Sequence, residues 1–217
     1  MLLYLSRLRL DPRSSQVRAE MRSPYEMHRT LSKAFAPPNM PEPAAQRVLA
    51  EARPLFRVDQ STVRGMVTAL IQSRTEPDWS QLTAADGYLV AAPEIRSFEP
   101  FFRGGQRFAF RLRANPTVKR AGKRRGLYQE EEQVAWLARK ATAGGFTVEQ
   151  AVPITEQQAL RARRGAGATE HLAVRFDGII RVADPACFRD TIAAGIGSAK
   201  GFGFGLLSIA PVQATNA

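Results

Sequence analysis

A short segment near the N-terminus, Ser23–Lys33, carries one of the two histidines of the chain, and its residue types suit proton transfer beside a phosphate. Three signals agree on a helix that begins here: Ser23 and Glu26 have capping-box spacing, and Pro24 stands at the first helical position. This start fixes which side chains share a face. At about 100° per residue, the polar arc holds Tyr25, His28, Arg29 and Ser32, with Lys33 at its edge. The opposite arc is suited to burial and holds Met27, Thr30, Leu31 and Ala34.

His28 can both accept and donate a proton near neutral pH, because imidazole titrates there. Tyr25 lies one turn before it on the same face. RNA offers a matching substrate, since its own 2′-hydroxyl is an internal nucleophile. Cleavage then needs deprotonation of that hydroxyl, protonation of the departing 5′-oxygen and cationic support for the phosphorane-like charge. On helical spacing alone, a polar helix face without any chemistry stays an open alternative.

Composition narrows the classes of function. The chain has 217 residues, 44% of them hydrophobic, enough to bury a core, and a net charge of +11 indicates an anionic partner, with nucleic acid the first candidate. No run of about 18 apolar residues suggests a membrane span, and the N-terminal residues are typical of a strand rather than a secretion signal. Cys187 is the single cysteine, so we expect no internal disulfide, no metal site, no cofactor and a cytoplasmic location.

The order of predicted elements is similar in the two halves of the chain. In the first half, a strand over 2–10 and the Ser23 helix precede a hairpin of 55–58 with 65–72 and a strand over 106–114, while a second helix is poorly signalled. In the second half, a helix over 130–143 precedes a strand over 146–152. Further β-like runs over 171–182 follow, which the dipeptide Asp177-Gly178 is expected to break into a tight hairpin.

A helix capped by Asp184 and a strand over 206–212 complete the second half. Each half thus approaches strand, helix, hairpin, helix, strand, which is the ferredoxin-like order. The sequence therefore predicts an α+β protein with tandem ferredoxin-like (βαββαβ) domains over 1–115 and 116–217, the first carrying the Ser23 helix.

Basic residues gather in three places that suit contact with a polyanion. The first has no acidic residue within it and holds Arg111, Arg113, Lys119, Arg120, Lys123, Arg124 and Arg125. A shorter basic loop holds Arg161, Arg163 and Arg164, and a glycine-rich stretch over 195–205 holds Lys200. A solvated surface is the alternative for the basic runs. For the glycines it is a helix C-cap followed by a tight turn.

Four segments, in order along the chain, resemble the CasE family, the CRISPR precursor-RNA endoribonucleases of type I-E Cascade. They are 24–33 (PYEMHRTLSK), 75–79 (TEPDW), 110–116 (FRLRANP) and the tail over 195–211. The resemblance implies two ferredoxin-like domains, capture of a repeat hairpin and one cut at the 3′ base of its stem. It further implies a 2′,3′-cyclic phosphate and a 5′-hydroxyl as products, tight retention of the product and membership in a complex with the CasA to CasD proteins and the guide RNA.

By the same resemblance, His28 and Tyr25 are the catalytic pair and Lys33 is an accessory cation. We assign His28 as general base and Tyr25 as acid or orienter, with the reverse open. Arg29, Ser32, Lys200 and the basic runs are RNA-binding candidates, and Arg161, Arg163 and Arg164 take the place of a hairpin-gripping segment. The alternative functions are a non-catalytic RNA-binding module and a basic scaffold subunit that acts only within a complex.

Overall fold

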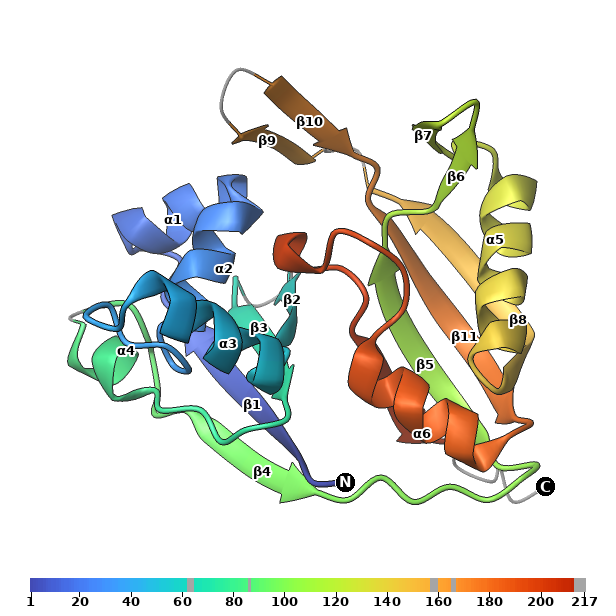
Figure 1. The fold of residues 1–217 in the computed structure, drawn as a ribbon, viewed down its shortest axis with the longest axis horizontal. Coiled ribbons are helices and arrows are strands. Elements are labelled where there is room, and N and C mark those ends of the chain that lie inside the picture. The colour runs from blue at the N-terminus through green and yellow to red at the C-terminus, as the bar shows by residue number, and fades with distance from the viewer. Residues whose placement is uncertain (62–64, 86, 157–159, 165–166, 213–217) are drawn as a thin grey trace. The chain divides into compact units, whose positions relative to one another are not determined.

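The computed structural model describes residues 1–61, 65–85, 87–156, 160–164 and 167–212, and the side chains of 160–170 lie outside what it describes. The chain forms two compact units. The first comprises Met1–Pro100 with Gly201–Gly203, and the second comprises the remainder from Phe101 onward. Each unit is built on a four-stranded antiparallel sheet with helices on one face (Figure 1).

The sheet of the first unit has the strand order β2-β3-β1-β4. Its strands are β1 (Leu3–Leu10), β2 (Leu55–Gln60), β3 (Val67–Ser73) and β4 (Glu94–Phe98). Its helices are α1 (Ser15–Arg22), α2 (Pro24–Ser32) and α3 (Glu42–Ala52) between β1 and β2, and the short α4 (Ser80–Ala84) between β3 and β4. The predicted hairpin is confirmed as the antiparallel pair β2 and β3. This order of elements and strands is ferredoxin-like.

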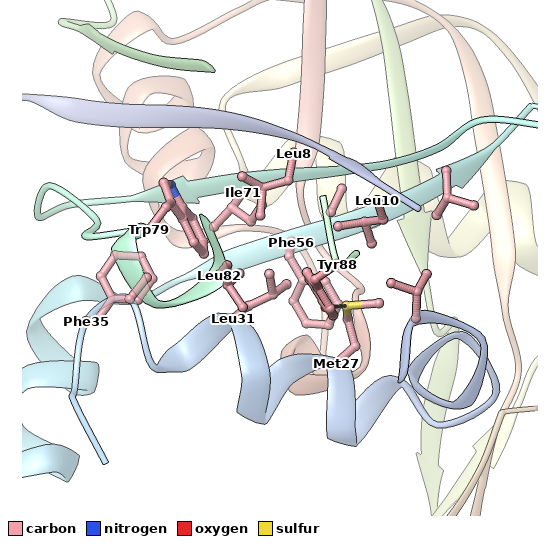
Figure 2. Close-up of a cluster of buried hydrophobic side chains, with 14 of the residues drawn as sticks. Leu8, Leu10, Met27, Leu31, Phe35, Phe56, Ile71, Trp79, Leu82 and Tyr88 are labelled. Atoms are coloured by element: carbon pink, nitrogen blue, oxygen red, sulfur yellow. Dashed lines mark hydrogen bonds between the residues drawn. The ribbon is translucent and has the colours of Figure 1, made fainter. Parts of the chain in front are cut away.

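Helix α2 docks on the sheet through the apolar face that the sequence predicts. Met27 and Leu31 are 1% and 2% exposed, and Figure 2 shows them directed at a cluster that includes Phe56 of β2 and Ile71 of β3. Ser23 is the N-cap as expected, but no side-chain capping bond forms. The predicted capping box is therefore not formed, although the helix begins where it was expected. Burial of the apolar face, rather than the cap, fixes this helix and leaves its polar face outward.

A buried carboxylate ties α1 to α2. Glu20 of α1 is 5% exposed and accepts hydrogen bonds from the hydroxyls of Thr30 and Tyr88, each at 2.6 Å, and from the amide of Gln16 at 2.9 Å. Burial, with Glu20 as second cause, raises the pKa of Tyr88 far above its ordinary value, so this phenol stays a donor. Three donors compensate the desolvation of the carboxylate. The contact to Thr30 sets how α2 lies against its neighbour.

Removing this carboxylate should destabilise the first unit. We expect Glu20→Ala to lower the free energy of unfolding by about 3 kcal/mol, because the hydroxyls of Thr30 and Tyr88 would stay buried without an acceptor. Gln16→Ala removes an exposed donor of the same network and should cost under about 1 kcal/mol. Urea denaturation measures both. Equal stability of the two variants would contradict this role of Glu20.

The second unit repeats the same topology in the strand order β12-β5-β11-β8. Its elements are β5 (Arg107–Ala114), β6 (Thr117–Arg120), β7 (Lys123–Gly126), α5 (Glu130–Ala143), β8 (Phe146–Thr155), β9 (Leu160–Arg164), β10 (Gly167–His171), β11 (Val174–Val182), α6 (Pro185–Ala194), the 3₁₀ turn η1 (Lys200–Phe202) and β12 (Leu207–Pro211). Strands β6 with β7 and β9 with β10 form two added hairpins. The α+β tandem ferredoxin-like fold is confirmed.

Packing in the second unit follows the predicted helices. Asp184 caps α6, its carboxylate accepting from the backbone N–H groups of Ala186 and Cys187 at 2.9 and 3.0 Å. Phe188 of α6 is fully buried, and its ring meets Phe146 at a centroid distance of 5.4 Å. Gly195 ends the helix with a positive φ of 71°, as the C-cap expectation required.

Three further sequence expectations differ from the structure. The units divide after Pro100 rather than after residue 115, because β5 pairs with β11 and β12 of the second sheet. Asp177-Gly178 makes no turn but lies inside β11, where a Cβ on Gly178 would stand 1.9 Å from the carbonyl oxygen of Gln150 on β8. The glycine there serves close strand packing. The basic segment around Arg161, expected as a loop, is strand β9.

Candidate active site

The polar face of α2 brings the two predicted proton-transfer groups together. The rings of Tyr25 and His28 have centroids 6.5 Å apart and are inclined at 50°. Tyr25 is 38% exposed and His28 is half-buried. The pair thus lies at the surface of the first unit, with the phenol more open than the imidazole. A phosphate that reaches both groups can meet an acid and a base at once.

Phe56 of β2 holds the imidazole plane. Its ring lies nearly parallel to His28, at 7° and a centroid distance of 6.1 Å, and Phe56 is itself 2% exposed in the core. Burial lowers the pKa of His28 below its usual 6.5. The imidazole is therefore neutral at neutral pH, which is the state a general base needs.

Ser32, one turn after His28, favours one tautomer of the ring. Its hydroxyl donates to the backbone carbonyl of His28 at 2.7 Å, and its oxygen stands 3.5 Å from Nδ1. Because the hydroxyl proton is committed to the carbonyl, the oxygen faces Nδ1 as an acceptor. This arrangement suits a proton on Nδ1 and leaves the lone pair on Nε2 for proton abstraction.

The glycine-rich segment belongs to this site as well, through the three residues that group with the first unit. A Cβ on Gly201 would stand 3.3 Å from Cδ2 and 3.6 Å from Nε2 of His28, so the missing side chain keeps the reactive edge of the ring open. Phe202 lies against Tyr25 with a centroid distance of 6.1 Å. The backbone of this segment therefore approaches the imidazole of the same chain closely.

Lys33 and Arg29 lie at the edges of the polar face. Lys33 is the exposed C-cap residue of α2. Arg29 is exposed and donates to the carboxylate of Glu26 one turn earlier, at 3.0 Å. An exposed pair of this kind is held by little energy, so the guanidinium can exchange Glu26 for a phosphate. No group of three or more His, Cys, Asp or Glu side chains lies together within the described part of the chain.

The long basic run divides into two parts with different surroundings. Arg111 and Arg113 on β5 are paired with acids distant in sequence: Arg111 with Asp177 of β11 at 2.6 Å, and Arg113 with Glu156, the residue after β8, at 3.0 Å. The expectation that this run lacks counter-charge is therefore wrong for these two residues. Pairing of the strands brings acids that are distant in sequence next to these two arginines.

The β6–β7 hairpin holds the other five cations of that run. All five are exposed: Lys119, Arg120, Lys123, Arg124 and Arg125. Arg120 stands 4.0 Å from Glu132, and the described residues form no ion pair with the other four. Arg161, Arg163 and Arg164 lie on β9, but their side chains are outside the described residues. Lys200, half-buried, begins the turn η1 before Gly201. The β6–β7 hairpin thus forms an exposed, positively charged surface of the second unit.

Comparisons with known proteins identify the family of this chain. A family model described as CRISPR associated protein covers residues 3–211. The chain is 39% identical over 224 residues to the CRISPR-associated endoribonuclease Cse3 of Thermus thermophilus, an alignment that covers 96% of this chain and all of that protein. The chain belongs to the CasE family. It is also 29% identical to the Cascade subunit CasE of Escherichia coli K12, over 97% of this chain and all of that one.

The fold of this chain matches solved CasE family structures over nearly its whole length. The Thermus thermophilus Cse3 structure with a 19-nucleotide RNA superposes with a TM-score of 0.83 at 36% identity, covering 96% of this chain and 100% of the other. A second Cse3 structure, bound to an RNA that represents a pre-cleavage complex, gives 0.80 at 36% identity, with 97% and 100% covered. Both structures contain RNA bound to Cse3.

Sequence reasoning missed two aromatic members of the site in this CasE protein. Phe56 lies on a strand and Phe202 in the glycine-rich tail, far from α2 in sequence, and both meet its polar face. The alternation of glycine and phenylalanine over 201–205 was the available signal, since glycines mark close backbone approach. Which ring the segment approaches depends on tertiary structure.

The two groups of cations in this CasE protein should respond differently to substitution. We expect Lys119→Gln or Arg125→Gln to reduce the slope of log affinity for RNA against log salt by about 0.7–0.9 each, because each exposed cation displaces counterions from a phosphate. Arg111→Gln should leave that slope unchanged, because its charge is already met by Asp177. Salt titrations of RNA binding measure both. A smaller slope for Arg111→Gln alone would contradict this division.

Proposed function

We propose that this protein binds the hairpin of a CRISPR repeat and cuts the precursor RNA at the 3′ base of the stem, with no metal ion in the reaction. The supporting observation is the Tyr25–His28 pair on an exposed helix face of a CasE family member. Its relatives are named as an endoribonuclease bound to RNA and as a Cascade subunit. Enzymatic relatives of this similarity favour catalysis over the alternative of a non-catalytic RNA-binding module.

In the proposed reaction, Nε2 of His28 removes the proton of the 2′-hydroxyl, and the resulting oxygen attacks the adjacent phosphorus. The bond from phosphorus to the 5′-oxygen breaks, and Tyr25 supplies the proton or orients the donor. The products are a 2′,3′-cyclic phosphate and a 5′-hydroxyl. Lys33 and Arg29 stabilise the negative charge that develops on the phosphoryl oxygens. Because the nucleophile belongs to the RNA, no bound water needs activation.

Cations outside the catalytic helix hold the RNA in this proposal. The exposed β6–β7 hairpin and Lys200 contact phosphates, and Arg161, Arg163 and Arg164 of β9 grip the stem. The product stays bound, and the protein acts as a subunit of Cascade together with the mature guide RNA, in the cytoplasm. No helix in the described residues has both the length and the apolar character that crossing a bilayer requires.

One assay tests the reaction type. The protein is incubated with its repeat RNA in excess chelator, and the ends of the fragments are mapped. We expect a single cut at the 3′ base of the stem, a 2′,3′-cyclic phosphate on the upstream fragment and close to one turnover per protein. A requirement for a divalent cation together with a 3′-hydroxyl product would overturn the proposal.

A further inference from the structure

A cavity of about 320 Å³ lies within the second unit, at the base of the β6–β7 hairpin. It is lined by residues from both ends of that hairpin, by His171 at the end of β10 with the following Leu172, and by Ser198 and Ala199 of the glycine-rich segment. Its volume is at the lower end of the range for ligand sites, which suits one nucleotide rather than a duplex. Ala199 adopts a positive φ of 60°, a conformation that residues with a side chain seldom take and that recurs at binding sites.

Tyr128 supplies an aromatic platform at this cavity. Its side chain is 68% exposed, although a large aromatic ring is normally buried. One side of the ring rests on Gly126, where a Cβ would stand 3.2 Å from the ring carbon Cε2. The absence of a side chain at Gly126 thus lets the ring lie close to the hairpin. An exposed, supported ring is the kind of surface on which a base stacks.

Arg124 of β7 gives the cavity a positive charge. It is exposed and lines the cavity together with Gly126 and Tyr128. It is one of the hairpin cations with which the described residues form no ion pair. A guanidinium beside an aromatic platform can bind the phosphate of the nucleotide whose base stacks on the ring.

Asn115 and His171 present fixed polar groups in the same cavity. Asn115 is 6% exposed, and its Nδ2 stands 3.0 Å from Nδ1 of His171. Burial lowers the pKa of His171, so the ring is neutral and its Nδ1 accepts from the amide. That hydrogen bond places the ring proton on Nε2. A polar pair with a fixed donor and acceptor pattern can discriminate one base edge from another.

We propose that this cavity binds one unpaired nucleotide of the RNA, with its base stacked on Tyr128, its phosphate on Arg124 and its edge toward Asn115 and His171. The inference rests on the proposed RNA-binding function and adds a nucleotide subsite to it. It also gives a role to His171, which the reaction at His28 leaves without one. The ligand is an unpaired nucleotide because a base within a stem offers no face for stacking.

The test uses repeat hairpins with unpaired flanks that carry the fluorescent base 2-aminopurine at one flanking position at a time. Binding of the wild-type protein should quench the fluorescence at one position. Tyr128→Ala should abolish that quenching and weaken binding by about 10-fold, the loss typical of one stacked base, whereas Tyr128→Phe should keep both. Phe101→Ala is the matched control, because Phe101 is an aromatic of the same unit with a similar exposed fraction, 76% against 68%, outside the cavity lining.

A hairpin trimmed of its unpaired flanks completes the design. Tyr128→Ala should bind it as tightly as the wild type does, and an equal loss on trimmed and flanked RNA would overturn the subsite. So would a wild-type protein that binds and cuts the flanked RNA with no quenching that depends on Tyr128. Quenching that depends on Tyr128 without any cutting would support the subsite and overturn the proposed cleavage instead.

Discussion

His28→Ala is expected to slow cleavage of the repeat hairpin by about 10²- to 10⁴-fold, the usual contribution of a positioned proton-transfer group. The affinity for the hairpin should change little. The imidazole is half-buried against Phe56, and the cations proposed to contact phosphates belong to other residues. Single-turnover cleavage and equilibrium binding, measured on the same RNA, separate the two effects.

Two controls make this result specific to proton transfer. Gln46→Ala removes an exposed polar side chain from α3 of the same unit, and it should cut at the wild-type rate. Circular dichroism should show that His28→Ala keeps its folded structure. Unchanged cutting by His28→Ala would refute its catalytic role, and absence of cutting in the wild type, with binding retained, would favour an RNA-binding module.

The wild-type pH profile should identify the role of His28. As general base the imidazole must be neutral, and burial lowers its pKa below 6.5. The rate should therefore rise with pH through a value below 6.5 and stay level above it. A rate that falls with pH over the same range would assign the proton-donating role to His28 and the opposite role to Tyr25. The profile of His28→Ala should lack this inflection.

Local patterns in the sequence predicted much of the fold. The helix over 130–143 begins after Gln129 and ends at Gly144, because acids at its start and glycines after its end are read from neighbouring residues. The side chains that this helix buries are not simply its apolar ones. Val134 is 38% exposed, while Gln133 and Trp136 are buried. The structure places Gln133 inward because its amide donates to the carbonyl of Leu127 at 3.1 Å, a bond that composition does not reveal.

What the sequence could not predict depends on contacts between distant residues. Helices α1 and α3 went unpredicted, and little of either helix is buried: among their residues only Val17, Glu20 and Ala52 are. Glu20 is stabilised inside the protein by partners on α2 and by Tyr88. The neutralisation of Arg111 by Asp177 likewise depends on strand register. Charges that look alike in sequence therefore have different surroundings in the structure.

The two units divide the proposed function between them. The first carries the proton-transfer pair on α2, held by Phe56 and by the glycine-rich residues Gly201 and Phe202. The second carries the cationic hairpin and the cavity beside Tyr128. Substitutions in the first unit should therefore change the rate of cutting more than affinity, and substitutions on the hairpin should do the reverse.

A repeat RNA with a single 2′-deoxy nucleotide at the cut site should not be cleaved. Loss of the 2′-hydroxyl removes the nucleophile that the RNA itself supplies. Intramolecular attack by that hydroxyl corresponds to an effective concentration of about 10⁵ M or more. The neutral imidazole of His28 would then have no hydroxyl proton to remove. The deoxy RNA should still compete for binding with the affinity of the all-RNA hairpin, since the phosphates and bases are unchanged.

The position of the deoxy nucleotide provides the matched control. An RNA with the deoxy nucleotide one position downstream of the cut site keeps the attacking 2′-hydroxyl. It should therefore be cleaved at the rate of the all-RNA substrate. Cleavage of the RNA that is deoxy at the cut site would mean that water is the nucleophile. A site that activates water must bind that water as a second reactant, whereas attack by the 2′-hydroxyl needs none. The proposed roles of Tyr25 and His28 would then be wrong.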